Sequence, residues 1–487
     1  MSGGVVYAGG GTKQQMEASI HDTPENMFNY LKLEVGDAVS DSTLRRFCNE
    51  STSMLEWLEK HGAKFEGSLC PWKCSYPTDQ YYLYYSGNEK AHPFNRNAQP
   101  AARGHRFVKP GLDSGSGLWK TLTDSAQKLN VQFKHLCHIE SIIMENGRFQ
   151  GLRALRVTED HAMFARHKKL SRKAKSLIIS SPKRAAKLRE QAEEIYKSAA
   201  LPETIKAKSV VLAAGGFAFN REWVNKFAPQ YKNTRPLGSG NDLGFGIRLG
   251  QSAGGTTSHM DRFTCWRFLT PPSTFLRGVA VGLNGKRIAA EDQYGATFSE
   301  ALIHDHGGRG YLILDSEQWR EAKARISVES TFPMNVPALW SLYWKHARAR
   351  SLEKLAKIIG VPADVMNETI QAYNDGVRSE SGDPYFKNPE YCSPISKPPF
   401  YAIDISIRDS ALHFATGLSL GGLRVDEESG SVLSDKGTTI PGVYAAGRNA
   451  VGLCSNRYIS GLSLADCVFS GRRAGKHAAL AARSVLS

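Results

Sequence analysis

The chain has 487 residues, of which 41% are hydrophobic and 22% charged, a composition typical of a globular protein large enough for two domains. It contains no run of eighteen apolar residues, and its first residues lack the basic start and apolar core of a signal peptide, so we expect a cytoplasmic protein without a transmembrane helix. Of its eight cysteines only Cys70 and Cys74 lie close together. Because no further ligands follow at regular spacing, they predict free thiols and no metal site.

The formal net charge of +15 raises the question of an anionic partner. Residues 153–208 hold fifteen Lys or Arg against six Asp or Glu, which is +9 of the total. Leu188, Ala192 and Ile195 in this segment have helical spacing. We therefore expect a solvated helical insertion over about residues 158–205. No aromatic residues interleave with the basic ones, so we expect no nucleic-acid site, whereas peripheral contact with an anionic membrane surface stays an alternative.

In chain order, the first third of the sequence alternates helical patterns with glycine-rich stretches. Seven of residues 1–12 are Gly, Ser or Ala, so we interpret this start as the interior of a cofactor-binding loop. Helices are predicted over Pro24–Glu34, over Ser42–His61 with a cap at Asp41 or Ser42, and from Ser114 to about Leu129. Strands are predicted over Val131–His135, Ile139–Met144 and Phe149–Arg156, the last two joined by an Asn-Gly turn.

Two buried strands that end in glycine lie roughly 230 residues apart. They are Ser209–Gly216 and the apolar run Gly442–Ala446, which ends on Gly447. Glycine at such an end lets a phosphate or a flat ring approach the backbone. An α/β nucleotide-binding domain built from both ends of the chain is the economical topology.

The stretch between these two strands differs in composition. Residues 260–405 hold more Trp, Tyr and Pro, and they follow an amphipathic helix predicted at Phe245–Ser252. A long helix is predicted near Ala347–Ile359, and a further helix carries Pro362 in its first turn. We interpret this stretch as an inserted α+β substrate domain. The predicted bounds are 1–256 and 409–487 for the two parts of the cofactor domain and 257–408 for the insertion.

Five motifs in a fixed order carry a family resemblance. The chain resembles the flavoprotein family that includes fumarate reductases and 3-ketosteroid dehydrogenases, and is most similar to its 3-ketosteroid Δ4-(5α)-dehydrogenase branch. The motifs are Ser2-Gly3-Gly4 with Tyr7–Thr12, the segment from Tyr85-Ser86-Gly87 to Arg103-Gly104-His105, Ala213–Phe217, Leu420–Leu423 and Ala445–Arg448.

The resemblance implies a Rossmann-like domain with a non-covalently bound FAD. The family's G-x-G-x-x-G turn does not occur in this sequence, so the first βα unit is expected to lie before Met1, and a flavin-free truncated remnant is one alternative. The implied cofactor-binding residues are Ser2, Gly3, Gly4, Gly10, Gly11, Thr12, Ala214, Gly215, Gly447, Arg448, Ser463 and Leu464.

The implied reaction removes hydrogen from a carbon–carbon bond next to the ketone of a steroid-like small molecule. It needs a base for the α-proton, donors for the developing enolate and a flavin to accept hydride. By resemblance, Tyr458 is the base, Ser460 is its relay partner, and Tyr294 extends the relay or lines the steroid site. The backbone at Gly461 would polarise the substrate carbonyl. Tyrosine needs such help because its ordinary pKa is about 10.

Arg457 favours a runner-up function. Asn456-Arg457 is similar to a pair in fumarate reductases whose arginine holds a substrate carboxylate. A fumarate- or enoate-type reductase is therefore the alternative, as is a steroid with an acidic side chain as substrate. Tyr294 disfavours the reductase, as does the lack of any arginine between Ile288 and Gly308, where fumarate reductases carry their acid.

Overall fold

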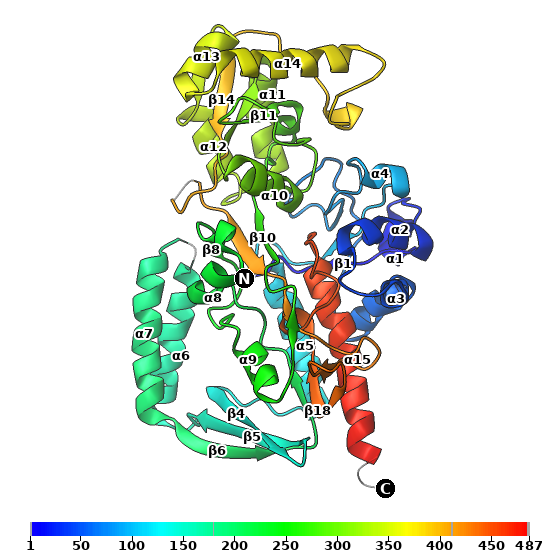
Figure 1. Ribbon diagram of the computed structural model, residues 1–487, viewed down its shortest axis with the longest axis vertical. Coiled ribbons are helices and arrows are strands. Elements are labelled where there is room, and N and C mark those ends of the chain that lie inside the picture. The colour runs from blue at the N-terminus through cyan, green and yellow to red at the C-terminus, as the bar shows by residue number, and fades with distance from the viewer. Residues whose placement is uncertain (1, 179, 411–412, 485–487) are drawn as a thin grey trace.

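The computed structural model describes residues 2–178, 180–410 and 413–484. Figure 1 shows a larger body, in which both ends of the chain take part, and a smaller lobe above it. None of the helices within the described ranges is long and apolar enough to cross a membrane.

The centre of the body is a parallel pair of strands from distant parts of the chain. β7 (Val210–Leu212) lies beside β18 (Thr439–Ala445), with Leu212 opposite Ala445. β17 (Ser431–Leu433) pairs with the other side of β18 in antiparallel fashion. Because β7 and β18 run in the same direction, the glycine turns that follow them emerge at the same edge of the sheet. The two glycine-ended runs, which are distant in sequence, therefore lie side by side in one sheet.

The C-terminal helix α15 (Leu462–Ser484) lies along this sheet (Figure 1). Just before it, the Gly461 carbonyl accepts a hydrogen bond of 3.1 Å from the N–H of Tyr7 in β1 (Val5–Tyr7). β1 pairs with β3 (Gly104–Arg106), which pairs with β2 (Leu83–Tyr84). The helices of this N-terminal part are α1 (Lys13–Glu17), α2 (Pro24–Val35), α3 (Asp41–Lys60), α4 (Phe94–Asn97) and α5 (Ser114–Lys128).

The basic insertion forms a helical hairpin at one side of the body (Figure 1). α6 (Ala162–Leu177) and α7 (Pro182–Ala199) lie side by side and are inserted between β5 (Arg148–Arg156) and β6 (Leu201–Lys206). β4 (Cys137–Glu145) completes this three-stranded sheet. The insertion is helical as expected, except that its last residues belong to β6.

The smaller lobe is built on an antiparallel sheet in the order β11-β12-β14-β13 with its own apolar core, which includes Val281, Ile313 and Ile370. Its strands are β11 (Val279–Gly282), β12 (Gly310–Leu314), β13 (Ala347–Ala349) and β14 (Phe400–Asp404). Its helices are α10 (Gly295–His306), α11 (Ser316–Glu329), α12 (Val336–Tyr343), α13 (Leu352–Ile359) and α14 (Ala363–Arg378).

Short strands and turns connect the lobe to the body. β10 (Phe263–Trp266) pairs with β15 (Thr416–Ser419), so the chain enters and leaves the lobe through neighbouring strands. The other elements are α8 (Arg221–Phe227), α9 (Phe245–Ser252), β8 (Arg235–Pro236), β9 (Thr257–Ser258), β16 (Gly422–Leu423), and the single 3₁₀ turns Pro229–Tyr231, Ser273–Arg277, Pro389–Tyr391 and Gly447–Asn449.

The helix predicted near Ala347–Ile359 is wrong in its first part. Ala347–Ala349 is strand β13, which pairs with β14 at the edge of the lobe sheet. The helix begins at Leu352, because the side chain of Ser351 accepts a hydrogen bond from the N–H of Lys354 and caps it. Pro362 stands just before α14 and caps it, one position earlier than expected.

The strand predicted over Val131–His135 is also wrong. This run is irregular, and the Val131 side chain is 51% exposed. Although its apolar and polar residues alternate, no strand among the described residues pairs with this run. The cap of α3 is Ser40, one residue before the predicted cap.

A buried ion pair ties the N-terminal turn to β3. The guanidinium of Arg103 makes two hydrogen bonds to the Asp22 carboxylate, at 2.8 and 2.7 Å, and both side chains are fully buried. Asp22 also accepts from the N–H of Gly10 and from the side-chain amide of Gln15. This network holds the turn that follows β1.

Replacing Asp22 with alanine should lower the free energy of unfolding by about 3–5 kcal/mol, because the charge of Arg103 would remain buried without a partner. Urea unfolding measures the loss. Asp41→Ala is the matched control: its carboxylate pairs with Lys32 at the surface, so its removal should cost less than about 1 kcal/mol. Equal losses in the two variants would contradict the structural role of the buried pair.

Candidate active site

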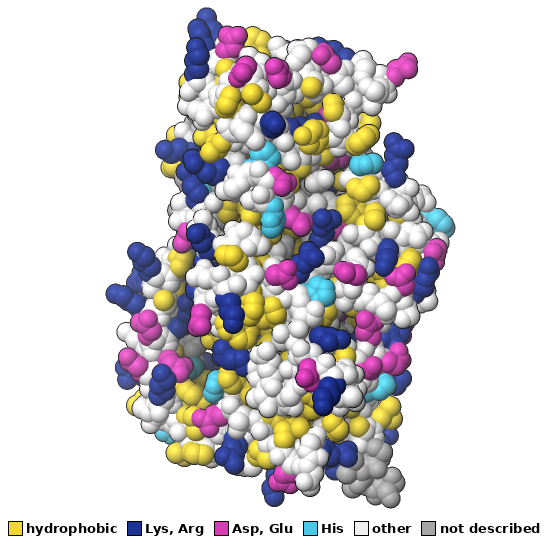
Figure 2. All heavy atoms as spheres, viewed as in Figure 1, with side chains coloured by type: hydrophobic (Ala, Val, Ile, Leu, Met, Phe, Trp, Pro, Cys, Tyr) yellow, Lys and Arg dark blue, Asp and Glu magenta, His cyan; other side chains and the backbone are white. Residues whose placement is uncertain are grey.

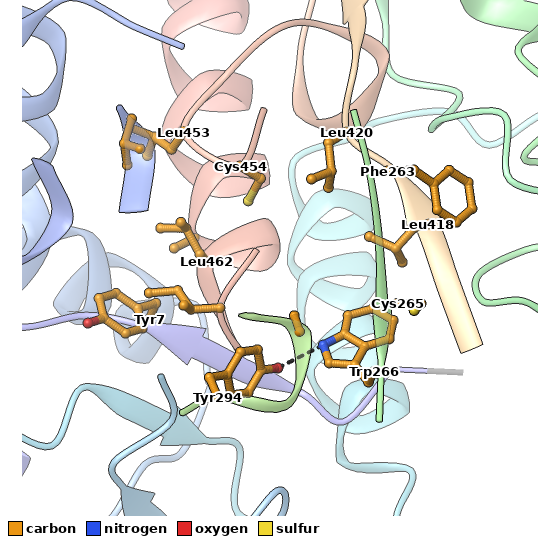
Figure 3. Close-up of a cluster of buried hydrophobic side chains, with 14 of the residues drawn as sticks. Tyr7, Phe263, Cys265, Trp266, Tyr294, Leu418, Leu420, Leu453, Cys454 and Leu462 are labelled. Atoms are coloured by element: carbon orange, nitrogen blue, oxygen red, sulfur yellow. Dashed lines mark hydrogen bonds between the residues drawn. The ribbon is translucent and has the colours of Figure 1, made fainter. Parts of the chain in front are cut away.

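Hydroxyl groups from three separate parts of the chain meet between the body and the lobe. Tyr294 stands at the start of α10, Ser460 lies two residues before α15, and Tyr84 ends β2. The Tyr84 hydroxyl lies 3.0 Å from Ser460 Oγ. Trp266 Nε1–H donates to the Tyr294 hydroxyl over 2.9 Å, and Figure 3 shows this bond.

Tyr458 joins this cluster through its ring, which packs edge-on against Trp266 with 5.0 Å between ring centroids. Burial raises the pKa of Tyr458 above its ordinary value, although a hydrogen bond with the backbone of Gly461 acts in the opposite direction. Burial also raises the pKa values of Tyr294 and Tyr84 well above the ordinary value. All three phenols therefore carry their protons at neutral pH, and a base formed from one of them needs donors around its oxygen.

Ser460 has a different partner from the one expected. Its hydroxyl contacts Tyr84, and a hydrogen bond with Ser460 lowers the pKa of Tyr294 against the larger effect of burial. The resemblance implies Ser460 as the relay partner of Tyr458, whereas in the structure its hydroxyl binds Tyr84 and Tyr294. Sequence reasoning missed Tyr84 because it is one of four tyrosines in the aromatic loop from Tyr81 to Tyr85, and no local pattern distinguishes it.

A cavity of about 590 Å³ opens beside Tyr458, a size that suits a small organic molecule. Arg457 lines it as well, and its Nε lies 3.1 Å from Glu300 of α10, so an ion pair between body and lobe forms part of the wall. The apolar lining includes Phe263, Ala296 and Leu420, and the polar lining includes Asp261, Arg262, Glu300, His304 and Asp305.

The expected cofactor residues at the strand ends lie together. Gly215 has a φ of +82° after β7, and Gly447 one of +58° after β18, so both turns use backbone that favours glycine. Arg448 lies over the first turn: its Nη2 binds Asp242 at 2.8 Å, and a Cβ added at Gly216 would stand 3.2 Å from its Nη1. Ala214 is exposed at this edge.

Several buried polar atoms beside these turns lack a protein partner. Arg448 Nη1 and both side-chain polar atoms of Asn449 are buried and make no hydrogen bond within the described residues. Gly447 also packs against α15, since a Cβ there would come within 2.9 Å of Cys467 Sγ. The first-turn N–H groups of Ser463 and Leu464 have no acceptor inside the helix. Glycine turns, unpaired donors and a helix start are the features that hold phosphate and ring oxygens, so these residues fit a flavin dinucleotide.

The N-terminal cofactor candidates separate into two groups. Ser2, Gly3 and Gly4 lie against the start of α5, where the N–H of Gly115 donates to the Ser2 carbonyl over 3.1 Å. A Cβ at Gly4 would collide with that same N–H at 2.5 Å, and one at Gly3 would collide with the Tyr76 ring. Close packing requires both glycines.

Gly10, Gly11 and Thr12 form a turn instead, in which Thr12 is buried and the two glycines are half-buried. The N–H of Gly10 binds Asp22, and those of Gly11 and Thr12 bind the side chain of Gln15 at 3.1 and 3.0 Å. The Thr12 side chain caps α1 in return. In contrast to the unpartnered polar atoms at the strand ends, the N–H groups of these three residues already have partners within the protein.

A buried carboxyl group lies behind the tyrosines. Glu34 of α2 is fully buried; its Oε1 accepts from the Tyr30 hydroxyl at 2.9 Å and from Asn88 Nδ2 at 2.8 Å, whereas its Oε2 has no partner in the described part of the chain. Burial raises the pKa of Glu34 to about 7. Asn88 in turn accepts from the N–H of Tyr294, so Glu34 belongs to the support of the site.

Glu34 should make the stability of the protein depend on pH. Since its pKa is raised in the folded state, the folded protein keeps a proton that the unfolded chain has released, and the free energy of unfolding falls as the pH rises from about 4.5 through about 7. Glu34→Gln should flatten this decline and exceed the wild type in stability near pH 8, by up to about 3 kcal/mol. Urea unfolding at several pH values tests this, with Glu56→Gln on the exposed face of α3 as control. A pH dependence that is unchanged by Glu34→Gln would contradict it.

Comparison with known proteins bears on this site. Residues 1–464 match the FAD binding domain family. The chain is 35% identical over 459 residues to 3-oxo-5-alpha-steroid 4-dehydrogenase of Comamonas testosteroni, an alignment that covers 92% of this chain and 85% of that protein. It is 28% identical over 283 residues to fumarate reductase (cytochrome) of Shewanella frigidimarina, covering 56% of this chain and 46% of that protein.

A solved structure extends the likeness to three dimensions. The 3-ketosteroid-delta4-(5alpha)-dehydrogenase from Rhodococcus jostii RHA1, in complex with 4-androstene-3,17-dione, superposes with a TM-score of 0.79 at 28% identity, covering 98% of this chain and 88% of that one. The mixed α/β fold is therefore that of FAD-binding flavoenzymes. With its strand-end glycines and hydroxyl cluster, the chain belongs to the FAD binding domain family.

Proposed function

We propose that this protein is an FAD-dependent dehydrogenase that oxidises a carbon–carbon bond next to the ketone of a 3-ketosteroid-like substrate. One observation carries the proposal: the cavity of about 590 Å³ has Tyr458 in its wall, and Tyr458 adjoins the Trp266–Tyr294 pair. The similarity to 3-oxo-5-alpha-steroid 4-dehydrogenase over most of both chains supports the same reaction class.

In this mechanism Tyr458 takes the proton from the carbon next to the ketone. Hydrogen bonds that favour its charged form come from the backbone of Gly461, and the positive charge of Arg448 acts in the same direction. Tyr294, held by Trp266, and Ser460 continue the hydroxyl network away from the substrate. Bound FAD supplies the acceptor for the hydride that leaves the neighbouring carbon.

FAD is expected to bind without a covalent bond. The residues that would hold it are Ala214 and Gly215 after β7, Gly447 and Arg448 after β18, and the first turn of α15 with Ser463 and Leu464. Support for this assignment comes from the unpartnered polar atoms of Arg448 and Asn449 at that edge. Ser2, Gly3 and Gly4 are assigned to the same cofactor domain, and so are Gly10, Gly11 and Thr12 in the adjoining turn.

The domain division belongs to the same proposal: a cofactor domain of residues 1–256 and 409–487, and a substrate domain of residues 257–408. The separate apolar core of the lobe supports this division. A first βα unit with a G-x-G-x-x-G turn would complete the cofactor domain. The free edge of β7 supports that unit, because β7 pairs only with β18 among the described residues.

A fumarate- or enoate-type reductase is the second candidate, and it rests on Arg457. The Arg457 side chain already forms an ion pair with Glu300 in the cavity wall, so its positive charge attracts a substrate carboxylate less strongly. The fumarate reductase relative also matches under half of its own length. The dehydrogenase is therefore the better-supported function, with Arg457 as a wall residue of the substrate site.

The purified protein should be yellow, and its flavin absorption should bleach when a saturated 3-ketosteroid is added without air or external reductant. Tyr458→Phe should slow this bleaching by about 100-fold or more, because the base is lost. Since burial raises the Tyr458 pKa, the wild-type rate should rise with pH between about 7 and 9. A flavin that is bleached only by an external reductant and turns yellow again when an enoate is added would favour the second candidate. A Tyr458→Phe variant of normal rate would remove the base assignment.

We also propose that the enzyme is cytoplasmic. It would make peripheral contact with an anionic membrane surface through the hairpin formed by α6 and α7. The eight cysteines are free thiols, in keeping with a reducing compartment. Figure 2 shows Lys and Arg side chains gathered at the edge of the molecule over this hairpin. The only ion pair of the hairpin within the described residues is Lys197–Glu193. Its exposed basic residues outside this ion pair are Arg166, Lys168, Lys169, Arg172, Lys173, Lys175, Lys183, Arg184 and Lys187.

Charge reversal on α6 tests this contact. Each cation near an anionic membrane contributes about 1 kcal/mol, so the combined change of Lys168, Lys169 and Arg172 to Glu should weaken binding to phosphatidylglycerol vesicles by about 100-fold or more. Cosedimentation measures it, with phosphatidylcholine vesicles for comparison. The control reverses three exposed basic residues of the lobe, Lys345, Lys354 and Lys357. Equal binding to both lipids would contradict membrane contact, and tighter binding to a single-stranded oligonucleotide would replace it with a nucleic-acid surface.

A further inference from the structure

Three residues at every second position of one short segment contact Ser460 and Tyr294, two members of the cluster of hydroxyl groups. The segment is Tyr84–Asn88, which leads out of β2, and its members Tyr84, Ser86 and Asn88 are all buried to within 1%. We propose that this segment is the positioning element of the active site, and that Tyr84 is a positioning residue that acts on catalysis through Ser460.

Ser460 is held from two sides by this segment. The Tyr84 hydroxyl binds Ser460 Oγ over 3.0 Å, whereas Ser86 binds the backbone. Ser86 Oγ donates to the Ser460 carbonyl over 3.0 Å, and the Ser86 carbonyl accepts the N–H of Ser460 over 3.3 Å. The Ser460 main chain is therefore held in place, and its hydroxyl binds Tyr84 in addition to Tyr294.

Room for this arrangement comes from β3. A Cβ at Gly104 would stand 2.5 Å from the Cβ of Ser86 and 2.9 Å from the ring of Tyr84. A glycine at this position is thus required for the segment to lie flat against β3. The Tyr84 ring packs among Val5, Cys70 and Cys74, which leaves its hydroxyl as the polar end that faces Ser460.

Asn88 holds the other member of the cluster. Its Oδ1 accepts from the backbone N–H of Tyr294 over 2.6 Å, and its Nδ2 donates to Thr297 Oγ1 and to Glu34, each over 2.8 Å. Its own N–H donates to the Tyr30 hydroxyl over 2.9 Å. All three N–H donors of Asn88 are therefore engaged, so it sets the start of α10 at one position relative to α2.

The consequence concerns the relation between the two parts of the site. Tyr294 belongs to the lobe and Ser460 to the body, and neither segment is adjacent to the other in sequence. The Tyr84–Asn88 segment binds both, so it determines the distance between their hydroxyls. Because misplacement of catalytic groups by about 1 Å can cost about 100-fold in rate, loss of one of these bonds should lower turnover rather than substrate binding.

This inference rests on the proposed function, and its test separates the two. Wild-type turnover of a saturated 3-ketosteroid by the holoenzyme is measured first, and its absence would contradict the proposed function. Tyr84→Phe removes one hydroxyl and keeps the ring. It should lower kcat about 10- to 100-fold, with KM and the melting temperature close to wild type. The matched control is Tyr81→Phe, since Tyr81 lies in the same loop but outside the segment, and its hydroxyl makes no hydrogen bond among the described contacts.

A double-mutant cycle decides whether Tyr84 acts through Ser460. In a Ser460→Ala background, Tyr84→Phe should cause no further loss of kcat. Full additivity of the two losses would overturn the proposal, as would a Tyr84→Phe enzyme with wild-type kcat. Asn88→Ala provides a second, independent measurement, and it should also lower kcat while the oxidised flavin still binds steroid with unchanged affinity, seen as a shift of its absorption spectrum. A loss of steroid affinity without a loss of kcat would assign the segment to binding and overturn the positioning role.

Discussion

The architecture depends on one contact between the two ends of the chain, where Gly461 meets β1. The N–H of Tyr7 donates to the Gly461 carbonyl, and the Gly461 φ of +94° is reached without strain only by glycine. A Cβ there would come within 2.8 Å of the Tyr7 nitrogen. The contact starts α15 at its first turn and leaves Tyr458 and Ser460 just before it, so the same junction orients the helix start and the two hydroxyls that we propose for catalysis.

Around this junction the protein buries several polar and charged groups, and their burial does not by itself favour the folded state. A fully buried carboxyl group such as Glu34 is costly unless all its atoms find partners, and one of its oxygens has none among the described residues. What such a network provides is geometry, since each hydrogen bond removes one way in which Tyr294 and Ser460 could move apart. The free-energy cost of burying these polar groups is offset by the large apolar core that continues from the body into the base of the lobe.

The sequence was most informative where a signal is local. The α2 helix starts at Pro24 behind a Thr23 cap, and α9 covers the residues expected from its apolar spacing, because caps and periodicity depend only on neighbours in sequence. Predictions failed where the decision depends on a distant partner. Ala347–Ala349 has helical composition but forms a strand, because β14 offers it an edge. Tyr84 escaped notice for the same reason, since its partner is 376 residues away.

The sequence by itself determined the class of the protein: five motifs in a fixed order carry its resemblance to a flavoprotein family, and that resemblance implies an FAD-dependent dehydrogenase. The tertiary structure alone decided which hydroxyls meet. Ser460 binds Tyr84, Tyr294 binds Trp266, and Arg457 is engaged with Glu300. The physical reason is that hydrogen bonds between side chains are short and directional, so they are determined by how separate elements pack, which residue type and spacing along the chain do not encode.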